Sequence, residues 1–198
     1  MRGQSKKSSH SPGSLRIIGG QWRSRRIELP AGTRVRPTPD RVRETVFNWI
    51  APWLSGAKCL DLYAGSGVLG FEALSRGAAG VIFVEQDRRL ARGIEVNGAS
   101  LGLQANDAGM QVLAIGAEQF LNSNCATSFD IAFLDPPYDV PLTRVFEQLL
   151  PYLNHRARVY VERSTADGLP QLERGEWTKR GKAGAVCFGL AAMTADIA

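Results

Sequence analysis

A glycine-rich segment at positions 61–70 is the first feature of the sequence that could bind a ligand. Gly65, Gly67 and Gly70 form a G-x-G-x-x-G pattern directly after a short apolar run. Glycine suits such a turn because a Cβ atom would block the close approach of the backbone to a ligand. Glu85 follows 20 positions after Gly65, where a carboxylate can accept hydrogen bonds from both hydroxyls of an adenosine ribose. The spacing therefore predicts a cofactor that contains adenosine.

Asp61, at the start of this segment, narrows the choice of cofactor. A carboxylate beside the loop attracts the cationic ammonium of S-adenosylmethionine and repels the pyrophosphate of a dinucleotide. We therefore expect S-adenosylmethionine, with a dinucleotide as the alternative. If no ligand binds, tight packing of a helix on a strand explains the glycines.

A second candidate motif, Asp135-Pro136-Pro137-Tyr138, follows an apolar run at 129–134. Consecutive prolines give a rigid extended turn without N–H donors, so its carbonyls can point outward as acceptors. Asp135 and the Pro136 carbonyl could then accept hydrogen bonds from an exocyclic base amine and expose its lone pair, while Tyr138 stacks on the base. We expect these four residues to be catalytic in methyl transfer to an amino nitrogen. An ordinary proline turn is the alternative.

Positive charge is concentrated at the N-terminus. The chain of 198 residues has a formal net charge of +5, and residues 1–43 contain eleven lysines and arginines against two acidic residues. Such an asymmetry is typical of a segment that contacts phosphate, and a solvated basic tail is the alternative. The expected RNA contacts are Arg16, Trp22, Arg23, Arg25, Arg26, Arg36, Arg41 and Arg43. The last three could instead bind the cofactor carboxylate, and Trp22 could pack against the body of the protein.

The two motifs need a scaffold that brings them together. Short apolar runs predict strands, and stretches with helical spacing between them predict helices. The expected strands are 58–63, 81–85, 111–115, 131–134 and 158–162, and the expected helices are 68–76, 88–101, 117–122 and 142–153. This alternation predicts a doubly wound, mostly parallel α/β sheet with both motifs at its carboxyl-end rim. Residues 177–182 and 185–192 predict an antiparallel C-terminal hairpin that completes a seven-stranded sheet.

The N-terminal quarter is expected to precede this domain as an appendage. Residues 15–29 predict a basic β-hairpin around Gly19-Gly20, and a helix is expected to begin with Thr38 as N-cap and Pro39 at its first position. The expected division is a disordered basic tail at 1–14, the hairpin and loop at 15–37, and the catalytic domain at 38–198.

Several classes of protein are disfavoured. Cys59, Cys125 and Cys187 are widely spaced and form no metal-binding pattern with His10 and His155, so we expect reduced thiols and no metal. No apolar run approaches the roughly 20 residues that cross a bilayer, and the N-terminus lacks the apolar core of a secretory signal. A cytoplasmic protein, most simply a monomer, is expected.

With these motifs, the sequence resembles the class I S-adenosylmethionine-dependent methyltransferases that carry a D/N-P-P-Y/F motif. It resembles more closely the bacterial 16S ribosomal RNA guanine-N2 methyltransferases. The segments that carry the resemblance are Arg16-Ile17-Ile18-Gly19-Gly20, Arg36-Pro37-Thr38, Asp40-Arg41-Val42-Arg43-Glu44, Ala64-Gly65-Ser66-Gly67 and Asp135-Pro136-Pro137. The resemblance implies a class I (Rossmann-like) fold, methyl transfer to N2 of a guanine equivalent to guanine 966, and 16S RNA or the 30S subunit as partner.

The resemblance also implies a set of cofactor contacts. The expected residues are Asp61, Tyr63, Ala64, Gly65, Ser66, Gly67, Leu69, Glu85, Gln86, Gly116, Ala117 and Asp135. Gly116-Ala117 stands where related enzymes often have Asp or Asn to hold the adenine amino group, so backbone groups near Ala117 are expected to replace it. Tyr138 stands where the family often has Phe, and both rings can stack on a base.

Two other functions stay open at this point. One is a DNA adenine-N6 methyltransferase, which the arginine-rich N-terminal segment disfavours. The other is an RNA-binding or assembly protein without activity, which the presence of Asp61, Glu85 and Asp135 disfavours.

Overall fold

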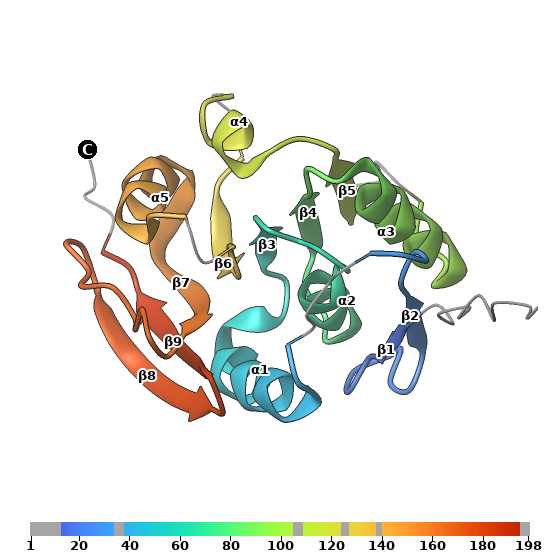
Figure 1. Ribbon diagram of the computed structural model, residues 1–198, viewed down its shortest axis with the longest axis horizontal. Helices are drawn as coiled ribbons and strands as arrows, with labels where there is room; N and C mark the ends of the chain where they lie inside the picture. The colour runs from blue at the N-terminus through green and yellow to red at the C-terminus, as the bar shows by residue number, and fades with distance from the viewer. Residues whose placement is uncertain (1–12, 34–37, 105–108, 124–126, 138–139, 195–198) are drawn as a thin grey trace, which may run out of the picture.

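A seven-stranded sheet forms the centre of the protein. The computed structural model describes residues 13–33, 38–104, 109–123, 127–137 and 140–194. The strands of the sheet are β3 (Lys58–Asp61), β4 (Gly80–Val84), β5 (Met110–Leu113), β6 (Phe129–Leu134), β7 (Leu153–Ser164), β8 (Glu176–Ala183) and β9 (Val186–Ala192). Within the described residues their order is β5-β4-β3-β6-β7-β9-β8 (Figure 1). Neighbours from β5 to β7 are parallel, whereas β9 is antiparallel to β7 and β8, so the predicted fold class is confirmed.

Helices cover both faces of this sheet. They are α1 (Asp40–Leu54), α2 (Val68–Ser75), α3 (Arg88–Ser100), α4 (Ala117–Leu121) and α5 (Leu142–Leu149), and a 3₁₀ turn, η1 (Leu150–Tyr152), follows α5. The buried side chains of α1, α2 and α3 pack in one apolar cluster, and those of α4 and α5 pack in another. The expected two-sided arrangement is therefore present (Figure 1).

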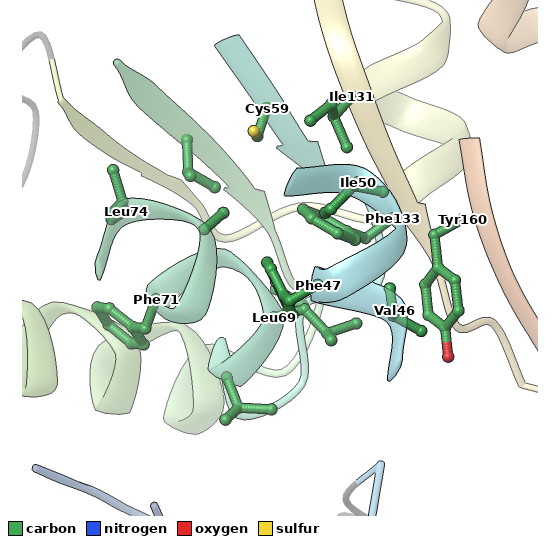
Figure 2. Close-up of a cluster of buried hydrophobic side chains, with 14 of the residues drawn as sticks. Val46, Phe47, Ile50, Cys59, Leu69, Phe71, Leu74, Ile131, Phe133 and Tyr160 are labelled. Carbon is green, nitrogen blue, oxygen red and sulfur yellow. The ribbon is translucent and has the colours of Figure 1, made fainter. Parts of the chain in front are cut away.

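Aromatic and branched side chains fill the core between α1, α2 and the sheet (Figure 2). The ring centroids of Phe47 and Phe133 lie 5.8 Å apart, and those of Phe133 and Tyr160 lie 6.4 Å apart. Cys59 is 1% exposed among these groups, and burial raises the pKa of its thiol. The side chain therefore has a packing role, as its place on an apolar strand suggests.

The N-terminal hairpin differs in detail from the prediction. Its strands β1 (Ser14–Arg16) and β2 (Arg26–Glu28) are antiparallel but only three residues long each. The chain between them turns onto α2, because the N–H groups of Ile18 and Gly19 donate to the Glu72 carboxylate, both at 2.8 Å. These two N–H groups therefore cannot form the cross-strand hydrogen bonds that would lengthen β1 and β2.

Three other element boundaries also differ. The N-cap of α1 is Pro39 without a side-chain cap, so the prediction of Thr38 as N-cap was wrong by one residue. The helix expected at 142–153 ends as α5 at Leu149, because Pro151 has no N–H to continue it. Strand β7 is longer than the predicted 158–162, since it begins at Leu153 and passes Arg156 with a positive φ of 62°.

Within the described residues, no helix is long and apolar enough to span a membrane. The same part of the chain holds no group of three or more His, Cys, Asp or Glu side chains that could bind a metal ion.

Candidate active site

The carboxyl ends of the central parallel strands bring the two sequence motifs into one cavity. Asp61 is paired with Phe133 across β3 and β6, so the segments after both strands leave the sheet at the same rim. The cavity there has a volume of about 920 Å³. The predicted site residues that line it are Asp61, Tyr63, Ala64, Gly65, Ser66, Leu69, Glu85, Gln86, Gly116, Ala117, Asp135, Pro136 and Pro137.

Asp61 provides a buried carboxyl group at the floor of the cavity. Its side chain accepts a hydrogen bond from the Gly70 N–H at 3.1 Å, and the residue is 3% exposed. Burial raises its pKa to about 7, the nearby charge of Glu85 also raises it, and the Gly70 N–H lowers it. A cation placed beside Asp61 would favour the charged carboxylate.

Glu85 is held in a fixed orientation at the end of β4. Its Oε2 accepts from the Gly65 N–H at 2.7 Å, and its Oε1 accepts from the Asp87 N–H at 2.8 Å. Burial raises the pKa of this carboxyl group, although the N–H donors oppose that shift. Each carboxylate oxygen has a second lone pair, so Glu85 can still accept hydrogen bonds from a ligand.

Gly65, Gly67 and Gly70 of the loop have different structural roles. Gly65 lines the cavity, whereas Gly67 adopts a φ of 75° as N-cap of α2, and a Cβ atom on it would lie 3.0 Å from Ile94 and 3.1 Å from Phe71. A Cβ atom on Gly70 would lie 2.2 Å from the Phe83 ring. Gly67, an expected cofactor contact, is therefore not among the residues that line the cavity. Gly70 is required because α2 packs closely on β4.

The Asp135 loop, which follows β6, forms another part of the cavity wall. Asp135, Pro136 and Pro137 line the cavity, while Tyr138 lies outside the described residues. Arg163 on β7, which is 8% exposed, donates from one guanidinium nitrogen to the carbonyls of Pro137 and Val140, each at 3.2 Å. The strand next to β6 thus braces the loop after the two prolines.

Sequence reasoning missed Arg163 and a second polar residue of β7, Glu162. Glu162 is 7% exposed, lines the cavity and accepts a hydrogen bond from the Tyr160 hydroxyl at 2.9 Å. The local signal was a charged pair directly after the apolar run Val159-Tyr160-Val161, where the strand meets the rim.

The other end of the cavity lies between β4, β5 and α4. Gly116 and Ala117 line it beside Gln86, together with the unpredicted residues Glu118 and Arg144. Arg144 and Glu118 form an ion pair at 2.7 Å, in which both side chains are largely exposed at the mouth.

Most of the predicted RNA contacts lie on the surface and away from the cavity. Arg16, Arg23, Arg25, Arg26 and Arg41 are exposed, and Arg36 lies outside the described residues. Arg25 donates to the Ser100 carbonyl at 2.7 Å, which ties the hairpin to α3. Trp22 is half-buried and packs against the core, so the packing alternative applies to it.

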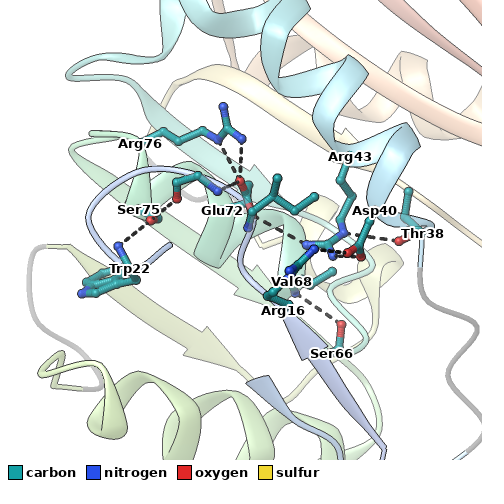
Figure 3. A network of polar contacts seen from close by, with 12 residues as sticks. Arg16, Trp22, Thr38, Asp40, Arg43, Ser66, Val68, Glu72, Ser75 and Arg76 are labelled. Atoms are coloured by element: carbon teal, nitrogen blue, oxygen red, sulfur yellow. Dashed lines mark hydrogen bonds and ion pairs between the residues drawn. The ribbon is translucent and has the colours of Figure 1, made fainter. Parts of the chain in front are cut away.

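Arg43 requires a correction. Its side chain is fully buried, with its guanidinium 2.6 Å from Asp40 and 3.6 Å from Glu72, and its Nε donates to the Thr38 carbonyl (Figure 3). The expected contact of Arg43 with RNA or a cofactor carboxylate is therefore wrong for this structure. The residue instead connects the start of α1 to α2.

Comparison with known proteins identifies the family. A family model described as Conserved hypothetical protein 95 matches residues 15–191. Ribosomal RNA small subunit methyltransferase D of Escherichia coli (strain K12) is 43% identical over 190 residues, which cover 93% of each chain. The chain belongs to the ribosomal RNA small subunit methyltransferase D family.

Solved structures agree with membership of the methyltransferase D family. The Escherichia coli protein yhhF is 38% identical, and the match has a TM-score of 0.83 and covers 93% of this chain and all of that one. The crystal structure of SMU.776 complexed with SAH is 13% identical in sequence. The match has a TM-score of 0.72 and covers 98% of this chain and 58% of that one. The second likeness shows that the family shares its fold with more distant proteins.

Proposed function

We propose that this chain transfers a methyl group from S-adenosylmethionine to the exocyclic N2 of a guanine in 16S ribosomal RNA. The observation that carries the proposal is that the glycine-rich loop and the Asp135 loop line one cavity. The relative named ribosomal RNA small subunit methyltransferase D supports the class of substrate, because it is 43% identical and matches nearly the whole chain.

The cavity fits S-adenosylmethionine at two points. Asp61 offers a buried carboxyl group that becomes charged most readily beside a cation, and the methionine part of the cofactor carries a cationic ammonium. Glu85 is oriented by two backbone N–H groups to accept hydrogen bonds from ribose hydroxyls. When bound, the cofactor supplies an electrophilic methyl group on a cationic sulfur.

Asp135 and Pro136 would activate the acceptor. The lone pair of a guanine amino group is delocalised into the ring, so the nitrogen is a weak nucleophile. Hydrogen bonds from its N–H groups to the Asp135 carboxylate and the Pro136 carbonyl would favour a pyramidal nitrogen with an available lone pair. After transfer the nitrogen is cationic, and one of its protons passes to Asp135 or to water. Arg163 keeps the loop in place through the Pro137 carbonyl.

The exposed N-terminal arginines would bind the RNA backbone. Arg16, Arg23, Arg25, Arg26 and Arg41 are exposed and can contact phosphates without reading the base sequence. We assign the hairpin and the loop up to residue 37 to the N-terminal appendage, residues 38–198 to the catalytic domain, and the residues before β1 to a basic tail. In this role the chain would act as a cytoplasmic monomer on the 30S subunit or an assembly intermediate, without a metal.

The proposal is tested by offering the protein and labelled S-adenosylmethionine three substrates: 30S subunits that lack the modification, naked 16S RNA and duplex DNA. Label is expected in the ribosomal RNA and not in the DNA. Asp135→Ala should reduce transfer at least about 100-fold, because it removes the acceptor that activates the amine, and should leave cofactor affinity within about threefold. Label in DNA adenine alone, or full activity of Asp135→Ala, would overturn the proposal.

A further inference from the structure

Glu162 is a buried carboxylate in the cavity wall that the mechanism above does not use. It lies near the carboxyl end of β7, is 7% exposed and lines the cavity beside Asp135. Burying a carboxylate is costly unless it is hydrogen-bonded, and the Tyr160 hydroxyl provides one such bond at 2.9 Å. This bond also fixes the direction of the carboxylate.

The register of the sheet places Glu162 next to Asp135. Strands β6 and β7 are parallel, and Leu134 is paired with Val161 at the end of β6. The next residue after Leu134 is Asp135, and the next after Val161 is Glu162. The backbones of Asp135 and Glu162 are therefore neighbours at the rim of the sheet.

Side-chain alternation puts both groups on the same side of the sheet. The rings of Phe133 and Tyr160 contact each other on one face, and residues two positions further on point to that same face. Asp135 and Glu162 both act electrostatically on the Tyr160 hydroxyl, whose pKa lies well above its ordinary value because of burial first and Glu162 next. Both carboxyl groups are therefore close enough to the Tyr160 hydroxyl to interact with it electrostatically.

Two adjacent acceptors match the hydrogen-bonding edge of guanine. Guanine presents its N2 amino group directly beside the N1–H donor. Adenine and cytosine instead present an amino group beside a ring nitrogen that carries a lone pair. A carboxylate accepts a hydrogen bond from N1–H but repels such a lone pair. If Asp135 accepts a hydrogen bond from the amino group, the neighbouring carboxyl group of Glu162 determines which base can bind.

We propose that Glu162 accepts the N1–H of the target guanine and thereby selects guanine over adenine and cytosine. This inference rests on the proposed function and adds a specificity-determining residue to it.

2-Aminopurine gives a direct test because it keeps the amino group at C2 but has a lone pair at N1. The substrates are 30S subunits reconstituted with 16S RNA that carries either base at the position the wild-type chain methylates. The wild-type kcat/KM should favour guanine by about 100-fold. In Glu162→Gln the amide can donate to N1 of 2-aminopurine, so the preference should fall by at least about tenfold while cofactor affinity, measured by calorimetry, stays unchanged.

Glu147→Gln is the matched control, since Glu147 is exposed on α5, and it should keep the wild-type preference. If Glu162→Gln does not fold, Glu162→Ala serves as the second variant and should also lose most of the preference. A wild-type preference in a folded, active Glu162 variant would overturn the inference and leave the proposed function intact. Absence of any guanine methylation by the wild-type chain would instead overturn the proposed function.

Discussion

At the residue scale, Asp61 links cofactor binding to pH. Its pKa of about 7 means that much of the ligand-free protein carries a neutral carboxyl group below neutrality. An ammonium group binds best to the charged form, so the affinity for S-adenosylmethionine should rise roughly tenfold between pH 5.5 and pH 7. Calorimetric titrations at constant ionic strength measure this change. Asp61→Asn should bind weakly with a flat profile, and a wild-type profile without slope would contradict the role of Asp61.

The same group affects the stability of the ligand-free protein. Its pKa is raised from 3.8 when unfolded to about 7 when folded, so its contribution favours the folded state fully below pH 4 and is lost as pH rises through 7. Replacing it by Asn should therefore raise the melting temperature more at pH 8 than at pH 5. An equal effect at both pH values would show that burial does not perturb this carboxyl group.

Residues could be predicted from the sequence where a local pattern marks them. Asp61 is the last residue of an apolar strand and Asp135 directly follows another, and the residues after each form recognisable turns. Glu162 also follows an apolar run, but no recognisable turn follows it, and its place in the site depends on the register between β6 and β7. Arg43 lies in a charged stretch that suggests a solvent-facing surface, and only the contact with Glu72 on α2 shows that it is buried.

At the element scale, Glu72 joins three parts of the chain (Figure 3). Its carboxylate accepts from the N–H groups of Ile18 and Gly19 in the hairpin and from Arg76, the C-cap of α2, and it lies 3.6 Å from Arg43 on α1. Glu72 is completely buried. Because α2 begins at the cofactor loop, this cluster fixes the hairpin relative to the cavity.

Glu72→Gln should therefore lower the free energy of unfolding by up to about 3–5 kcal/mol, because it removes the buried charge that faces both Arg43 and Arg76 and leaves Arg43 with only its ion pair to the half-exposed Asp40. Urea denaturation measures the change. The control is Glu95→Gln, which breaks the ion pair with Arg92, an exposed side chain, and should cost less than about 1 kcal/mol. A loss below 1 kcal/mol in Glu72→Gln would show that the cluster does not hold these elements together.

The long elements follow local patterns, and the irregular ones do not. Apolar runs located the five parallel strands of the sheet because both faces of these strands are covered by helices. The start of β7 contains polar residues and passes Arg156 at a positive φ, where its register with β6 shifts. The shape of the hairpin depends on the distant side chain of Glu72, which no local pattern reveals.

At the scale of the whole molecule, positive charge lies on the hairpin while the catalytic motifs lie at the rim of the sheet. Replacing Arg23, Arg25 and Arg26 by Gln should weaken RNA binding and reduce the slope of log affinity against log salt by about two, since each phosphate contact contributes about 0.7 to 0.9. Binding measured at several salt concentrations gives this slope.

The control for the hairpin variant replaces three exposed basic residues on the edge strand β8 by Gln and so removes the same charge elsewhere. The residues replaced in this β8 variant are Lys179, Arg180 and Lys182. The β8 variant should keep a slope closer to that of the wild-type protein. Equal losses in the two variants would mean that total charge, and not the hairpin, determines RNA binding.

The central claim is that the two loops at the rim form one site that methylates N2 of guanine. The most direct measurement is to digest the RNA of 30S subunits treated with the protein and S-adenosylmethionine to nucleosides and to identify the product by chromatography and mass spectrometry. The account predicts N2-methylguanosine with the wild-type protein and none with Asp135→Ala. A methyl group on any other nucleoside, or equal amounts of N2-methylguanosine with both proteins, would contradict it.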